Sequence, residues 1–69
     1  MIDYSPLWKT MKDMNISQYQ LISMGIEKSL LDRLRKNQNI TLVSVERLCK
    51  ILGCTPNDIF TFRTDEQKK

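Results

Sequence analysis

Residues 17–36 read SQYQLISMGIEKSLLDRLRK, and this stretch predicts two short helices joined by a tight turn. Ser17 and Gln20 fit a capping box at the start of the first helix, in which each side chain accepts a hydrogen bond from the other residue's backbone N–H. Gly25 can adopt the positive φ that closes a helix. A second helix is predicted from about residue 27 to residue 36. The rest of the chain is expected to hold these two helices at a fixed angle.

Positive charge is concentrated in and after this second helix. Residues 25–50 carry six basic and three acidic side chains, and the difference equals the formal net charge of the whole chain, +3. The sequence pI of about 9.1 suits a polyanionic partner. Two helices around a tight turn, the second of them basic, are the layout of a helix-turn-helix, whose second helix lies in the major groove of DNA. The sequence therefore predicts a small DNA-binding domain.

Three further helical segments are predicted around this motif, so the expected fold is all-α with five helices. The dipeptide Ser5-Pro6 indicates a helix start, with serine as N-cap and proline at the first helical position. Thr41 is predicted to cap a helix over residues 42–52 that Gly53 ends, and a single helical turn is expected after Thr55. The positions expected to be buried repeat at helical spacing: Leu7, Trp8, Met11, Met14, Leu21, Ile22, Ile26, Leu30, Leu31, Leu34, Val45, Leu48, Cys49 and Leu52.

Both ends of the expected core alternate apolar and polar residues, as short strands do. Ile2 and Tyr4 at one end could pair with Phe60 and Phe62 at the other, either within one chain or between two subunits. The sequence leaves both pairings open. The charged segment 63–69 is expected to be a frayed tail.

The size and residue content bound the function. A chain of 69 residues is expected to form one domain over residues 1–69, with its core at about 5–62. It has no histidine and two cysteines five positions apart, whereas a zinc site needs about four such ligands, so no metal or cofactor is expected. The sequence lacks a glycine-rich phosphate loop and grouped carboxylates, so neither an enzyme nor a small-molecule site is expected. No apolar run approaches the roughly 20 residues that span a bilayer, and the start of the chain does not read as a signal peptide, so a cytoplasmic protein is expected.

The residues expected to contact DNA lie on and around the second helix of the motif. Its first two turns would place Lys28, Ser29, Asp32 and Arg33 nearest the base edges, because offsets of one, four and five share a helix face. Arg33 is the best candidate for reading guanine, because its planar fork matches O6 and N7. Asp32 is expected to pair with a lysine four residues away, Lys28 or Lys36. The residues expected to contact phosphates are Gln18, Arg35, Lys36, Asn37 and Asn39.

Two alternatives compete with this interpretation. The charges on the second helix could form a solvated face laced with i,i+4 pairs and read no bases. The domain could also bind a partner protein, as an antitoxin or a regulator partner does, with little DNA readout. The residues that keep this second alternative open are acidic or read bases weakly: Glu27, Ser29 and Asp32.

Taken together, these residues resemble the Cro/repressor (Xre) family of helix-turn-helix regulators, and most closely its small Xre-like subgroup. The resemblance runs from about Leu7 to Phe62. It rests on the order and spacing of five stretches: the start Tyr4-x-x-Leu7-Trp8-Lys9, then residues 16–22 (ISQYQLI), 31–35 (LDRLR), 45–52 (VERLCKIL) and 54–59 (CTPNDI). It implies a five-helix all-α fold, sequence-specific binding of duplex DNA and transcriptional regulation, commonly as a homodimer. Carried over by position, the family's base readers fall on Lys28, Ser29 and Arg33, and the glutamine of its second helix falls on Gln18.

The chain departs from this family pattern around the turn. Ile22 stands where a small alanine is usual, Glu27 stands where a serine or threonine cap is common, and the turn is one residue shorter. These departures bear on the angle between the two helices of the motif. A homodimer is also expected from geometry, because one module of this size makes too few base contacts for tight specific binding.

Overall fold

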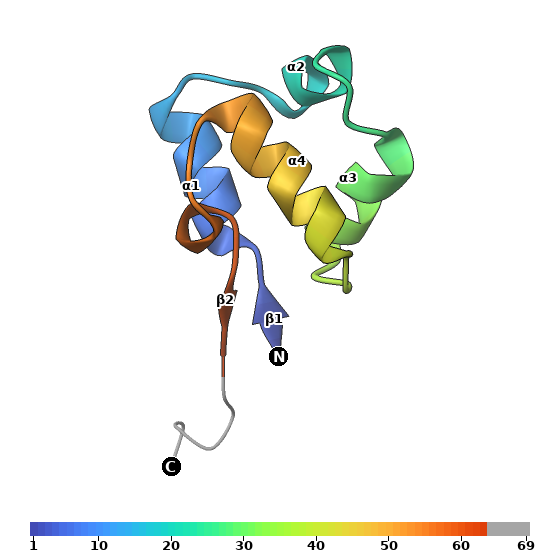
Figure 1. Ribbon diagram of the computed structural model, residues 1–69, viewed down its shortest axis with the longest axis vertical. Helices are drawn as coiled ribbons and strands as arrows, with labels where there is room; N and C mark the ends of the chain where they lie inside the picture. Colours follow the sequence, from blue (N-terminus) through green and yellow to red (C-terminus); the bar gives the residue numbers. More distant parts are fainter. Residues whose placement is uncertain (64–69) are drawn as a thin grey trace.

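A computed structural model describes residues 1–63 as four α-helices, one short 3₁₀ turn and a two-stranded sheet (Figure 1). The elements follow in the order β1 (Ile2–Asp3), α1 (Ser5–Asp13), α2 (Gln18–Ser23), α3 (Lys28–Arg35), α4 (Leu42–Leu52), η1 (Pro56–Asp58) and β2 (Thr61–Phe62). The mostly helical class is confirmed, but the expectation of five helices is wrong. The fifth is a three-residue 3₁₀ turn, because the chain must enter β2 only three residues after Asp58.

Local signals fix the ends of α2 and α4 as expected. At the start of α2, the Gln20 backbone N–H donates to the Ser17 hydroxyl at 3.1 Å and the Ser17 backbone N–H donates to the Gln20 side chain at 2.8 Å. Thr41 caps α4 by accepting from the Ser44 N–H at 3.1 Å. Gly25 and Gly53 follow α2 and α4 with φ of 111° and 66°.

The start of α1 differs from the expectation that Ser5 is its N-cap. Ser5 is the first helical residue, and its backbone N–H and hydroxyl both donate to the Asp3 carboxylate, at 3.0 and 2.7 Å. Asp3 therefore satisfies the free donor at this helix end. Its carboxylate is held in place because Asp3 also pairs in the terminal sheet.

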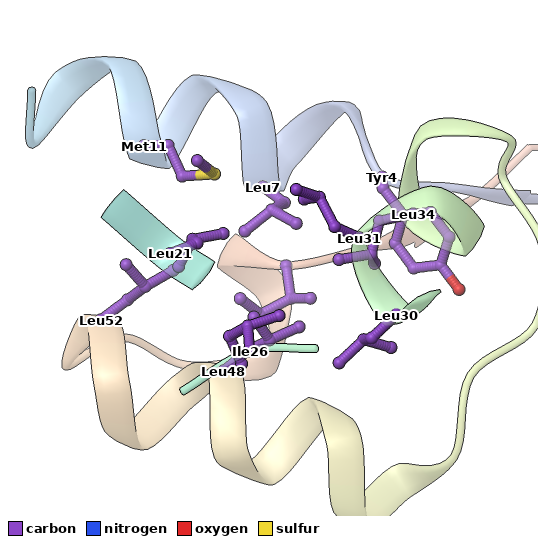
Figure 2. Close-up of a cluster of buried hydrophobic side chains, with 11 residues drawn as sticks. Tyr4, Leu7, Met11, Leu21, Ile26, Leu30, Leu31, Leu34, Leu48 and Leu52 are labelled. Carbon is purple, nitrogen blue, oxygen red and sulfur yellow. The ribbon is translucent and has the colours of Figure 1, made fainter. Parts of the chain in front are cut away.

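One hydrophobic core lies between the helices, and Figure 2 shows side chains from α1, α2, α3 and α4 meeting in it. Two expected core residues are exposed instead. Met14 is exposed because α1 ends one residue before it, and Ile22 is exposed because Ile26, from the turn after α2, joins Leu21 in the core. Cys49 is only half-buried. The buried cluster consists of Tyr4, Leu7, Met11, Leu21, Ile26, Leu30, Leu31, Leu34, Leu48, Leu52 and Ile59.

The two terminal strands pair with each other within one chain. They run antiparallel, with Ile2 opposite Phe62 and Asp3 opposite Thr61. Arg63 belongs to this arrangement, because its backbone N–H donates to the Met1 carbonyl at 2.7 Å. The frayed tail expected over residues 63–69 stays a prediction, because residues 64–69 lie outside the described residues.

Tyr4, which directly follows β1, connects this sheet to the loop after α3 through two hydrogen bonds. Its buried side chain donates from the hydroxyl to the Gln38 carbonyl at 2.6 Å, and its backbone N–H donates to Asn37 Oδ1 at 3.2 Å. The terminal sheet and the end of α3 are thus joined directly. Among the helices of residues 1–63, none has the length and apolar character needed to cross a membrane.

Candidate nucleic-acid interface

The exposed face of α3 lies opposite three buried leucines. Leu30, Leu31 and Leu34 anchor the helix in the core, as expected from their spacing, and Figure 2 shows them pointing into the buried cluster. The four residues predicted to contact bases, Lys28, Ser29, Asp32 and Arg33, are all exposed. Because they repeat at helical spacing, they lie together on the face turned away from the core. Their predicted contacts with bases stay a prediction.

Asp32 pairs with an arginine and not with a lysine. Its Oδ1 lies 2.8 Å from Arg35 Nη2, one helical turn away, so the expected pairing with Lys28 or Lys36 is wrong. A residue three positions along the helix is as close a neighbour as one four positions along, and the arginine fork offers a directed donor to the carboxylate. Both side chains are about half exposed, so the pair contributes little to stability.

This pairing decides which charges on α3 remain available to a ligand. Among residues 1–63, Lys28, Arg33 and Lys36 form no salt bridge with a carboxylate. The charge of Arg35 is paired with that of Asp32. The face is therefore not laced with i,i+4 ion pairs, which weighs against the interpretation of α3 as a merely solvated helix. It presents three cations whose charge no described carboxylate offsets.

The residues predicted to contact phosphates are spread around α3, and they differ in their exposure and in the hydrogen bonds they already make. Gln18 is the first residue of α2 and is half-buried, whereas Lys36, Asn37 and Asn39 are exposed at and after the end of α3. The Asn37 side-chain oxygen accepts from the Tyr4 N–H, and the side-chain amide nitrogen is the group that could donate to phosphate. The structure thus gathers the base-contact candidates on one face and places the phosphate candidates at the two ends of the motif.

Arg47 on α4 holds the turn between α2 and α3. Its Nη2 donates to the Gly25 carbonyl at 2.7 Å, and its Nη1 lies 3.2 and 3.3 Å from the two carboxylate oxygens of Glu27. The pKa of Glu27 is lowered, first by a hydrogen bond from the backbone N–H of Glu27 and then by the Arg47 guanidinium. Sequence reasoning missed this role. Arg47 and Glu27 are 20 residues apart, on different parts of the fold, and no periodic pattern in the sequence links them.

Within residues 1–63 no three His, Cys, Asp or Glu side chains come close enough to share a metal. Burial, followed by the neighbouring Cys49 and Asp58, raises the pKa of the Cys54 thiol to about 11. A thiol with so high a pKa is almost fully protonated at neutral pH and is a poor nucleophile.

Comparisons with known proteins agree with this geometry. The family described as "Cro/C1-type HTH DNA-binding domain" matches residues 6–65. The crystal structure of the transcriptional regulator VanUg is similar to this chain at 31% sequence identity and a TM-score of 0.80, and the match covers 87% of this chain and 81% of VanUg. No curated protein matches the sequence. Because the family match spans most of the chain, the chain belongs to the Cro/C1-type helix-turn-helix DNA-binding domain family.

Proposed function

We propose that residues 1–69 form a single sequence-specific, double-stranded DNA-binding domain that regulates transcription in the cytoplasm, with α3 in the major groove. The observation that carries this proposal is the exposed face of α3. It bears Lys28 and Arg33, and Lys36 follows directly as the C-cap; none of the three has a described carboxylate partner, and three buried leucines fix the helix in place. Membership of the Cro/C1-type family supports it, as does the likeness to VanUg, which is described as a transcriptional regulator.

The proposed base contacts follow from the side chains on that face. Arg33 would donate two hydrogen bonds to guanine O6 and N7, and Lys28 would donate to the same edge or to phosphate. Asp32 would accept from the amino group of cytosine, and Ser29 would donate or accept with little selectivity. Around them, Gln18, Arg35, Lys36, Asn37 and Asn39 would fix the register of the domain through phosphate contacts.

We further propose that the domain binds DNA as a homodimer. One α3 covers only a few base pairs, and two copies on half-sites one helical turn apart, about 34 Å, supply the missing contacts. Sedimentation of the free protein and of its complex with the preferred duplex measures this directly. Two protomers on each duplex are expected, and a monomer under both conditions would overturn the dimer.

The function is tested by selecting duplexes from a random library and titrating the preferred one by fluorescence anisotropy at several salt concentrations. An enriched, roughly two-fold motif is expected, with log affinity falling against log salt at a slope near −0.9 for each phosphate contacted. Enrichment without a motif, together with a shallow slope, would overturn the proposal and leave the protein-interaction module as the better account.

A matched pair of double variants assigns the binding to α3. Replacing Lys28 and Arg33 by alanine should weaken binding of the preferred duplex by about tenfold or more, since each good base contact is worth ~1–3 kcal/mol. The control replaces Lys9 and Lys12, two exposed lysines of α1, and makes the same change in net charge. Because α1 precedes the helix-turn-helix and carries none of the predicted DNA contacts, the control should change affinity only slightly. Equal losses in the two variants would show that net charge, and not α3, governs binding.

A further inference from the structure

The clamp formed by Arg47 bridges both sides of the turn that leads into α3. One guanidinium nitrogen binds the carbonyl of Gly25, the turn residue with φ of 111°. A second nitrogen binds the carboxylate of Glu27, the residue immediately before α3. Ile26, between them, is buried in the core. The three consecutive residues that set the direction of α3 are therefore held by α4 and the core together.

The start of α3 lacks the usual means of fixing a helix end. Glu27 occupies the N-cap position with an extended backbone, yet its side chain makes no capping hydrogen bond to the helix. Its carboxylate points instead to Arg47. Lys28 and Ser29 follow directly, so a small rotation of this first turn would move the side chains proposed to meet the bases. The leucines of α3 fix which face is buried, and the clamp fixes how its first turn is aimed.

We propose that Arg47 is a positioning residue for DNA readout, which holds the first turn of α3 at the angle that base contact requires without itself contacting DNA. This inference rests on the proposed DNA-binding function. Two of the three guanidinium nitrogens of Arg47 have partners within the protein, and its charge is offset by Glu27. A residue that acts in this way should affect the discrimination between sequences more than the electrostatic attraction to phosphates.

The chain offers a matched control on the same helix. Lys50 of α4 forms an exposed ion pair with Glu46 at 3.9 Å, within α4 and away from the turn. The variants Arg47→Met and Lys50→Met therefore remove the same charge from the same element, but only the first opens the clamp. Arg47→Lys is the third variant, because a lysine keeps the charge and cannot bridge two acceptors with a rigid fork.

The experiment measures affinity for the preferred duplex and for a duplex with one base pair changed, each at several salt concentrations. Circular dichroism establishes that every variant is folded at the temperature used. Arg47→Met should weaken binding of the preferred duplex by about tenfold and reduce the discrimination against the changed duplex, as expected when a residue outside the contact surface controls its geometry. Lys50→Met should change both quantities less than twofold, and Arg47→Lys should resemble Arg47→Met.

A double-mutant cycle and the salt slope complete the test. Glu27→Gln should weaken discrimination on its own and should add nothing in the Arg47→Met background, because the clamp is already open. The salt slope should stay unchanged in Arg47→Met. A slope smaller by about 0.9 would identify Arg47 as a phosphate contact and overturn the positioning role. If Arg47→Met is unfolded, Arg47→Lys and Glu27→Gln carry the same test.

The failure of this inference differs from failure of the proposed function. A wild-type protein that prefers no duplex would overturn both. A wild-type protein with a clear preference, whose Arg47→Met variant discriminates as well as Lys50→Met does, would overturn only the role of Arg47.

Discussion

The carboxylate of Asp3 shows how much one residue can contribute at the end of the chain. It is buried, accepts two hydrogen bonds from Ser5 and lies 3.5 Å from Arg63 Nε. The hydrogen bonds from the Ser5 hydroxyl and backbone N–H lower the pKa of Asp3 below its ordinary value of 3.8, with a smaller effect from Arg63. Burial opposes this shift but does not cancel it.

A lowered pKa in the folded state means that the Asp3 carboxylate stabilises the fold at neutral pH. This contribution is complete above the unfolded-state pKa and is lost as the pH falls through the lower folded-state value. We expect Asp3→Asn to be less stable than the wild type by about 1 kcal/mol at pH 7, the usual size of a helix-capping effect. Chemical denaturation at pH 7 and at pH values below 3.8 measures this difference, which should shrink in acid. Asp13→Asn, at the exposed far end of α1, is the control, and a difference that persists in acid would contradict the assignment to ionisation.

Among the elements, those governed by local chemistry were predictable and those governed by distant partners were not. The capping box of α2, the Thr41 cap and the leucine face of α3 depend on residues within one or two turns, and sequence spacing displays them. The exposure of Ile22 depends on which neighbour fills the core, and the clamp of Arg47 depends on two elements meeting. The spacing of residues in the sequence predicts neither the exposure of Ile22 nor the contacts of Arg47. In the candidate interface the exposed face was predictable, but the partner of Asp32 was not, because residues three and four positions away are equally close neighbours and spacing does not choose between them.

The two glycine turns make a prediction at this scale. A Cβ at Gly25 or at Gly53 would meet no atom within 4 Å, so only the backbone opposes a side chain there. The φ of 66° at Gly53 lies in the left-handed region that other residues can enter, whereas 111° at Gly25 lies outside it. We expect Gly25→Ala to lower the free energy of unfolding by ~1–3 kcal/mol. Gly53→Ala should lower it by less. Urea denaturation of both variants measures this, and equal losses would contradict the backbone argument.

At the scale of the whole molecule, Tyr4 joins three parts of the chain that are far apart in sequence. It follows β1, packs in the core and binds the loop after α3 through Asn37 and Gln38. Burial also raises the pKa of its hydroxyl above the ordinary value of 10.0, because the charged phenolate would be poorly solvated there. The interface candidates at the end of α3 are thus supported by the N-terminal segment.

Removing only the hydroxyl tests this support. Tyr4→Phe keeps the buried ring and leaves the Gln38 carbonyl without its partner, so we expect a loss of about 1 kcal/mol. In a domain of this size that corresponds to a fall in Tm of about 4–8 °C. Tyr19→Phe is the matched control, because Tyr19 is 78% exposed and should leave the Tm unchanged. An unchanged Tm in Tyr4→Phe would show that the hydroxyl only replaces a hydrogen bond to water.

The pairing of β1 with β2 also has a consequence for the order of events in folding. The Met1 amine and the Arg63 carbonyl that it contacts are 62 positions apart, whereas the helices and their caps form between near neighbours. Contacts between distant positions form late, because much of the chain must be ordered before they become favourable. We therefore expect the helix-turn-helix to assemble first and the two ends to close over it last. In the folded protein the same sheet would be the first part to open, which exchange of its backbone amide hydrogens with solvent would reveal.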